Sequence, residues 1–177
     1  NSDWGYLDGE EFSWRRNFYH KPIASLNWEW DLNSSSKLST VLYGSWGRGG
    51  GSGPIGRING DREYYSQFYD ADGLVRFDDI VTWNSGGTVA DFGDDRTDGS
   101  PYTNDRSTGF SRRASMNSHD WYGVIANYHN DINDNLSIDL GFDLRTYTGY
   151  HYRIVNDVLG ADQYFDNRDI NNPDRTI

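Results

Sequence analysis

The sequence predicts an all-β fold of antiparallel hairpins, and three observations support this prediction. Apolar and polar residues alternate along four segments, which is the period of a strand whose two faces meet different surroundings. The segment NWEWDLN at 27–33 is repeated as NYHNDIN at 127–133. A polar, Asx-rich turn and then a Leu-Ser pair follow each copy, which is typical of one hairpin design used twice.

The first predicted hairpin joins strands at about 19–32 and 37–46 through a polar turn. Its first strand has an apolar residue at every second position, opposite Ser, Asn, Glu and Asp. These apolar residues are Ala24, Leu26, Trp28, Trp30 and Leu32. The second strand places Leu38, Leu42 and Trp46 on one side, while its other side is less polar.

The second predicted hairpin joins strands at about 119–132 and 136–147. The last strand has the strictest alternation, because Ser, Asp, Gly and Asp separate its large apolar residues. These residues are Leu136, Ile138, Leu140, Phe142 and Leu144. Two environments suit such a strand: a soluble sheet with one wet face, or a barrel wall with lipid outside and water inside.

The connections between the strands alternate in length. Short turns close each hairpin, whereas the segment 47–118 separates the two hairpins. Loops this long are uncommon in compact domains, but outer-membrane barrels combine short turns with long external loops. The apolar faces also extend over about nine or ten residues, as a tilted membrane-spanning strand requires. The prediction is therefore a partial barrel segment, with 47–118 as a long external loop and 148–177 as the start of a second one.

The alternative fold is a soluble, secreted β-sandwich that binds carbohydrate through exposed Trp and Tyr residues. It accounts for the acidity and for the 7 Trp and 13 Tyr of the chain, but not for the long connection. In the barrel fold, aromatic residues near the strand ends are expected to form interface girdles: Trp28 and Trp30 at one end, and Tyr19, Trp121 and Tyr147 at the other. Four strands cannot close a barrel in lipid, so the chain is expected to be a piece of a longer protein.

The long loop contains a predicted helix and a candidate cation site. Apolar residues spaced by three and four positions predict a short helix at about 73–83, with Asp72 as its N-cap. Alternating carboxylates make Asp70 and Asp72 candidate calcium ligands. The twelfth position of that motif is Val81 instead of Glu, so a role in Asx turns is the alternative.

Composition excludes several functional classes. The net charge of −11 argues against nucleic-acid binding, because phosphates would not be neutralised. No apolar run is long enough for a membrane-spanning helix, and the lack of cysteine excludes a disulfide scaffold and thiolate metal chemistry. The four histidines are scattered, and no catalytic triad order, phosphate loop or dinucleotide fingerprint is present. The sequence therefore predicts neither an enzyme nor a cofactor.

Three stretches, at 38–53, 70–85 and 117–166, together resemble the barrel region of TonB-dependent outer-membrane receptors of the type with a carboxypeptidase-regulatory-like N-terminal domain. The most specific parts are RTYTGYHYR at 145–153 and VNDVLG at 155–160. The resemblance implies a transmembrane barrel of about 22 strands in the bacterial outer membrane, which imports a nutrient with energy supplied by TonB. The implied partners are the remainder of the barrel, its plug domain, the TonB complex, outer-membrane lipid and, in some members, a surface lipoprotein. The family does not fix the nutrient, which is an iron chelate, a vitamin, a glycan or a peptide.

In this architecture the two faces of each strand and the loop have separate roles. The polar face is expected to meet the lumen or the plug, through Asn27, Glu29, Asp139, Asp143 and Arg145. The apolar face is expected to contact lipid, through Leu26, Trp28, Trp30, Leu136, Ile138, Leu140, Phe142 and Leu144. Loop aromatics combine stacking area with polar tips, so they are the candidate ligand contacts. These candidates are Tyr64, Tyr65, Tyr69, Trp83 and Tyr102.

Overall fold

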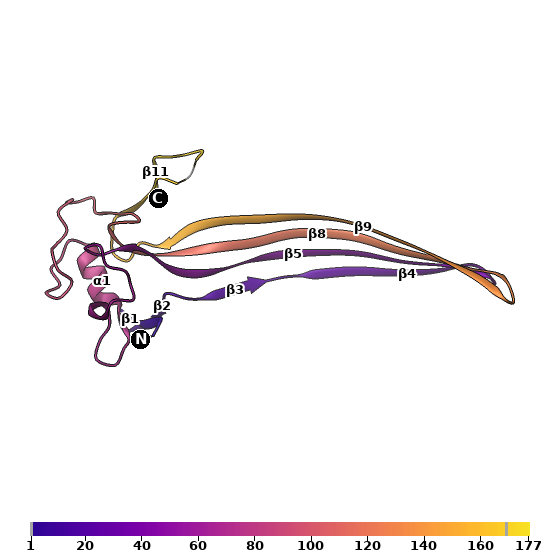
Figure 1. The fold of residues 1–177 in the computed structure, drawn as a ribbon, viewed down its shortest axis with the longest axis horizontal. Helices are drawn as coiled ribbons and strands as arrows, with labels where there is room; N and C mark the ends of the chain where they lie inside the picture. The colour runs from indigo at the N-terminus through magenta and orange to yellow at the C-terminus, as the bar shows by residue number, and fades with distance from the viewer. Residues whose placement is uncertain (1, 169) are drawn as a thin grey trace. The chain divides into compact units, whose positions relative to one another are not determined.

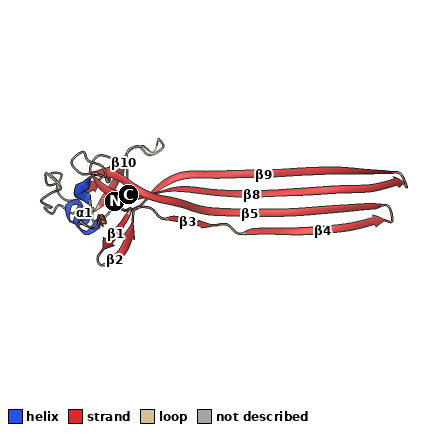
Figure 2. Ribbon diagram, turned by 60° about the horizontal axis from the view of Figure 1, so that its bottom comes forward, coloured by secondary structure: helices blue, strands red, loops and turns tan. Residues whose placement is uncertain are grey.

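The computed structural model describes residues 2–168 and 170–177 and confirms a mostly β protein with antiparallel hairpins (Figures 1 and 2). Contacts divide the chain into two compact units. We call Phe18–Gly50 with Met116–Tyr152 the hairpin unit. The remainder, namely the chain up to Asn17, Gly51–Ser115 and Arg153–Ile177, is the loop unit. The long strands contribute residues to both units.

The main sheet is built from five strands, and Figures 1 and 2 show the first two of them lying end to end alongside the other three. These strands are β3 (Asn17–His20), β4 (Ile23–Asn33), β5 (Ser36–Arg57), β8 (Gly109–Asn133) and β9 (Leu136–Asp157). The order is β3-β5-β8-β9, and β4 also pairs with β5. The two predicted hairpins are thus β4–β5 and β8–β9.

The register of β4 against β5 separates an apolar face from a polar face. Leu26 lies opposite Leu42, and Trp30 lies opposite Leu38, so apolar side chains gather on one face. On the other face, Asp31 lies opposite Lys37. The apolar face continues onto β8, because the indole Nε1 of Trp46 donates a hydrogen bond of 2.6 Å to the hydroxyl of Tyr122. We call these two surfaces of the hairpin unit the apolar face and the polar face.

The first predicted strand is interrupted, and the others are longer than predicted. Residues 21 and 22 separate β3 from β4, because Pro22 has no backbone N–H for the ladder. The strand predicted at 37–46 continues to Arg57 as β5, although glycines hide its alternation. Gly49 lies in this extension of β5. A Cβ added there would lie only 2.6 Å from the carbonyl oxygen of Phe18 on β3. Only glycine lets the two backbones approach so closely.

The segment predicted as a loop at 47–118 therefore includes strand at both of its ends. β8 already begins at Gly109, well before the predicted start at about 119. Likewise, β9 continues to Asp157 and takes up the beginning of the segment predicted as a second loop at 148–177. Backbone pairing continues there without a strict alternation of side chains, so the period of the sequence underestimates strand length.

The loop unit contains two small sheets, one α-helix and one 3-10 helix among the described residues. One sheet has the order β2-β1-β6, formed by β1 (Trp4–Leu7), β2 (Glu10–Ser13) and β6 (Val75–Arg76). The other has the order β11-β10-β7, formed by β7 (Thr103–Asn104), β10 (Gln163–Asp166) and β11 (Arg175–Thr176). The helices are η1 (Ser66–Phe68) and α1 (Phe77–Asn84).

The hydrophobic core lies in the loop unit. Its largest members are aromatic, and Phe77 meets Trp14 edge-on at 4.8 Å while Phe68 meets Phe110 edge-on at 4.9 Å. These side chains come from segments far apart in the chain, so the long loop is a packed structure and not an extended linker. No helix in the described part of the chain is long and apolar enough to cross a membrane.

Helix α1 is shorter than the helix predicted at 73–83. The segment Val75–Arg76 is a strand that pairs in parallel with β1, so the helix begins only at Phe77. Arg76, and not Asp72, is the residue before the helix. Asp78 and Asp79 lie in the first turn, where carboxylates interact favourably with the positive end of the helix dipole.

Candidate functional site

The residues predicted to contact lipid are all exposed in the hairpin unit. Their fractional exposure runs from 40% at Ile138 to 63% at Leu26. The indole rings of Trp28 and Trp30 stack on one another at 5.8 Å and remain open to the outside. The other members of this exposed set are Leu136, Leu140, Phe142 and Leu144. Large continuous apolar patches of this kind mark surfaces that contact a partner or a membrane.

A polar cluster ends the apolar face. The guanidinium of Arg48 lies 2.7 Å from an Asp120 carboxylate oxygen, and the hydroxyl of Tyr150 donates a hydrogen bond of 3.1 Å to the other oxygen. Arg48 comes two residues after Trp46, and Asp120 two residues before Tyr122, so the cluster lies on the same side of the sheet as that aromatic pair. Sequence reasoning missed this cluster because its three members come from three different strands.

The polar face carries exposed ion pairs at the predicted lumen positions. Glu29 pairs with Lys37 at 2.7 Å, and Asp139 lies 2.9 Å from the Nδ1 atom of His129. Asp143 and Arg145 pair with one another at 3.0 Å. Every partner is well exposed, so each pair contributes little to stability. Asn27 also lies on this face, opposite Val41 in the register.

An aromatic row on the polar face was not predicted. Tyr43 of β5 meets the edge of Trp121 at 6.1 Å, and Trp121 meets Tyr147 edge-on at 6.2 Å. The ring of His119 stacks on Tyr147 at 5.7 Å, and its Nδ1 atom lies 3.2 Å from the hydroxyl of Tyr19. Tyr19, Trp121 and Tyr147 therefore do not belong to a lipid-facing girdle at this end. Their odd positions in the strands place them on the polar face.

Only part of the predicted ligand-contact set is accessible. Tyr64 and Tyr65 are exposed and stack on one another at 5.2 Å. Tyr69 and Tyr102 are half-buried. Trp83 is only 3% exposed and is not available to a ligand, because the helical period places it on the buried side of α1.

Asp70, one of the two candidate calcium ligands, caps a turn in this structure. The carboxylate of Asp70 accepts hydrogen bonds of 2.9 Å from the backbone amides of Asp72 and Leu74. This is the Asx-turn role, in which the side chain caps the backbone of a tight turn. Among the described residues, no group of three His, Cys, Asp or Glu side chains has the geometry to hold a metal ion.

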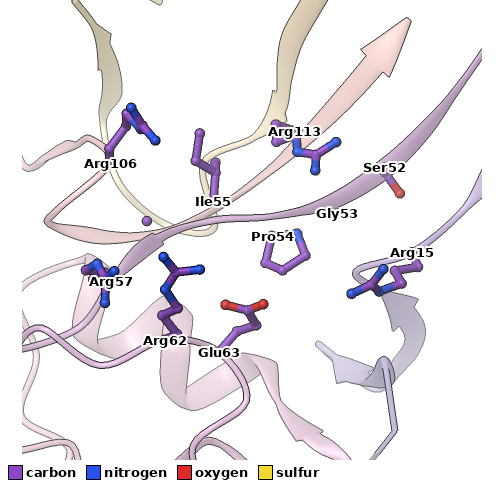
Figure 3. Close-up of a pocket in the computed structure, with 11 residues that line it drawn as sticks. Arg15, Ser52, Gly53, Pro54, Ile55, Arg57, Arg62, Glu63, Arg106 and Arg113 are labelled. Carbon is purple, nitrogen blue, oxygen red and sulfur yellow. The ribbon is translucent and has the colours of Figure 1, made fainter. Parts of the chain in front are cut away.

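A cavity in the loop unit, which sequence reasoning missed, is lined by arginines. Its volume is about 320 Å³. The basic residues around it are Arg15, Arg57, Arg62, Arg106 and Arg113 (Figure 3). We call this cavity the arginine pocket. Its residues come from five places in the chain, so no local motif indicates it.

Arg96 organises the loop unit from a buried position. Its side chain is fully buried and donates to the backbone oxygens of Asn84 and Thr103, at 2.9 and 2.8 Å. It also donates to the Asn104 side-chain oxygen and pairs with Asp98. Arg96 thus joins the end of α1 to β7, and its fixed fork of donors suits several acceptors in one plane.

The pKa values of two loop carboxyls predict how the loop unit responds to acid. Hydrogen bonding to Arg96 lowers the pKa of Asp98, and hydrogen bonding to Arg76 lowers the pKa of Asp91. A carboxyl with a depressed pKa stabilises the fold above its ordinary pKa, near 3.8 for both groups, and this stability is lost as the pH falls through the folded-state value.

The backbone amide of Thr103 donates to the Asp98 carboxylate at 3.4 Å, so we expect it to lose hydrogen-exchange protection as the pH falls from about 5 to about 3. Asp98→Asn is expected to reduce this pH dependence, because it removes the titrating group. Both carboxylates are more than a third exposed, so solvent screening keeps the effect modest. Equal pH dependence in the wild type and in Asp98→Asn would contradict the assignment.

Three features of the described residues therefore bear on function. They are the exposed apolar face and the aromatic row of the hairpin unit, and the arginine pocket of the loop unit. Comparison of the chain with protein-family models, with curated proteins and with solved structures found no match.

Proposed function

We propose that the chain is a wall segment of an importer in a bacterial outer membrane. In this proposal, β4, β5, β8 and β9 belong to a large transmembrane barrel of about 22 strands, and the loop unit lies outside the cell. The importer takes up a nutrient, which is an iron chelate, a vitamin, a glycan or a peptide, with energy delivered by TonB. The observation that carries the proposal is the exposed apolar face of the hairpin unit.

Exposure of this face is unfavourable in water. Burying one Leu or Phe side chain is worth about 1.5–3 kcal/mol, so a row of exposed ones represents a large unfavourable surface. The row on β9 runs from Leu136 to Leu144, about the length that a tilted strand needs to cross the hydrocarbon of a membrane. Contact with lipid removes these side chains from water without a second protein layer.

The polar features of the hairpin unit also suit a barrel. The cluster of Arg48, Asp120 and Tyr150 ends the apolar face, where polar groups reach the membrane–water interface. The ion pairs and the aromatic row on the polar face suit an aqueous lumen or contact with a plug domain. In a soluble β-sandwich, by contrast, the apolar row of β9 would be packed against a second sheet.

The remaining edge of β9 supports a longer wall. Among the described residues, β9 pairs along the main sheet only with β8. An unpaired edge has no water to bond in lipid, so further strands of the same protein are required to continue the sheet. The proposed partners are therefore the rest of the barrel with its plug, outer-membrane lipid, the TonB complex and, in receptors that use one, a surface lipoprotein.

A pair of adjacent cysteines tests the proposal. The chain has no cysteine, so Leu140→Cys and Asp139→Cys each give a single labelling site within it. Neighbouring residues of a strand point to opposite faces, so the two sites differ in environment and hardly at all in depth. We expect a fluorescent label at position 140 of the full-length protein, in its membrane, to be quenched by brominated lipid. The label at 139 is expected to be quenched by aqueous iodide instead.

Each variant serves as the control for the other. Equal quenching by iodide at both positions would show that the apolar face meets water, and the proposal would fail. Equal protection from both quenchers would place Leu140 in a protein core, as a sandwich requires, and would also overturn it.

A further inference from the structure

The arginine pocket concentrates positive charge in an acidic chain. Five of the 16 basic residues line it, against a single acidic lining residue, Glu63, whereas the whole chain has a net charge of −11. The guanidinium groups lie around the end of β5 that carries Gly53, Pro54 and Ile55 (Figure 3). Such a local excess of one sign raises the local concentration of ions of the opposite sign.

Most of these arginines lack an acidic partner among the described residues. The side chains of Arg62 and Arg106 have no hydrogen bond or ion pair there, in contrast to Arg48, Arg76, Arg96 and Arg145. Arg57 donates only to the backbone oxygen of Gly60, at 2.7 Å, and Arg113 only to the hydroxyl of Ser115, at 2.8 Å.

The acidic residues near the pocket do not neutralise it. Arg15 pairs with Asp3 at 3.1 Å, and both of these side chains are mostly exposed. Glu63 forms no ion pair among the described residues. Burial lowers the pKa of Arg113, and the nearby charges of Arg153 and Arg15 lower it further. A bound anion would relieve this repulsion.

The backbone of β5 forms one side of the pocket, through Gly53, Pro54, Ile55 and Gly56. A Cβ added at Gly53 would lie 3.5 Å from an Arg113 nitrogen, an ordinary contact distance, so this guanidinium lies directly beside the backbone of β5. Gly56 has a φ of +108°, a conformation that disfavours any side chain, and a Cβ there would collide with the carbonyl oxygen of Gly109. Between these two glycines, Pro54 and Ile55 are the residues of β5 whose side chains line the pocket.

We infer that the arginine pocket binds a small molecule with at least two negative charges on carboxylate or phosphate groups. Guanidinium forks form paired hydrogen bonds with both of these groups. A volume of about 320 Å³ lies at the lower end of the range for small-molecule sites. The inference rests on the proposed function in one respect, because it takes this anion to be the ligand that the external loop of the importer captures.

Calorimetric titration of the full-length protein in detergent tests this inference. The probes are pyrophosphate and the tricarboxylate tricarballylate, each at low ionic strength. Arg62→Gln and Arg106→Gln each remove an arginine whose side chain has no hydrogen bond or ion pair among the described residues, and we expect each to weaken binding about tenfold and the double variant about a hundredfold. Arg145→Gln is the matched control, since it removes one arginine from the polar face of the hairpin unit and is expected to leave the affinity unchanged.

The possible outcomes separate the inference from the proposed function. Binding of either probe that depends on Arg62 and Arg106 supports the inference. The probe that binds more tightly shows whether the pocket prefers phosphate or carboxylate groups. Failure of both probes, or equal binding by the double variant and Arg145→Gln, overturns it. Unchanged hydrogen exchange at Phe110 shows that the glutamine variants remain folded. The cysteine labels at positions 139 and 140 test the membrane proposal independently of any anion.

Discussion

Replacing Arg96 with methionine is expected to destabilise the loop unit by about 3 kcal/mol. Methionine keeps part of the packing between the rings of Trp83 and Tyr102, which lie 5.5 and 5.3 Å from the guanidinium carbon. It removes every donor, so the buried acceptors on Asn84 and Asn104 lose hydrogen bonds that no water replaces. Native-state hydrogen exchange measures the loss as about a hundredfold lower protection of amides in the loop unit.

Three further variants separate the contributions of Arg96. Arg96→Lys keeps the charge but not the planar fork, so we expect an intermediate loss of protection. Asp98→Asn is expected to have a small effect, because that carboxylate is partly exposed and water solvates it. Arg145→Met removes an exposed arginine and is expected to change stability by no more than about 0.5 kcal/mol. If Arg96→Met and Arg145→Met lose protection equally, Arg96 does not organise the loop unit.

Replacing Leu140 with arginine is expected to reduce insertion of the full-length protein into lipid vesicles. Leu140 is the central residue of the apolar row from Leu136 to Leu144, so it lies near the bilayer midplane in the proposed barrel. A charged residue facing lipid at that depth destabilises a barrel by about 2–4 kcal/mol. The measurement is the fraction of folded, protease-resistant protein as a function of urea concentration.

Gly141→Arg is the matched control for Leu140→Arg. It lies next to Leu140 in the strand and therefore points to the polar face. A Cβ there has its nearest neighbour, the Asn127 side-chain oxygen, at 4.0 Å, so the first atom of the new side chain causes no clash. We expect it to change stability by less than about 0.5 kcal/mol, as is usual for exposed positions. Similar effects of Gly141→Arg and Leu140→Arg would contradict a lipid-facing apolar side.

The sequence predicted the strands best where the alternation of side chains extends over the residues whose backbones pair. From Leu26 to Leu32 in β4 and from Leu136 to Leu144 in β9 every second residue is large and apolar, and this pattern predicts both the strands and the face to which each side chain belongs. The same reasoning failed at the Gly-rich end of β5, because glycine has no side chain to display a period. It also failed at Val75–Arg76, where pairing with β1 overrides a helical spacing of apolar residues.

The candidate sites were less predictable than the strands. Residues of one face follow one another in the sequence, so Asp143 and Arg145 were recognisable as a pair. The arginine pocket and the aromatic row combine residues from separate strands and loops, and their meeting depends on strand order and register. Trp83 was predicted to contact a ligand because it is aromatic, but its burial in the core excludes that contact.

The sequence by itself determined the two hairpins, their two unlike faces and the acidic, cysteine-free character of the chain, because each is a property of neighbouring residues. Only the tertiary structure decided that the long loop has its own core, that Arg96 is buried within it, and that five arginines surround one cavity. These features depend on contacts between residues distant in the chain, and such contacts leave no local period in the sequence.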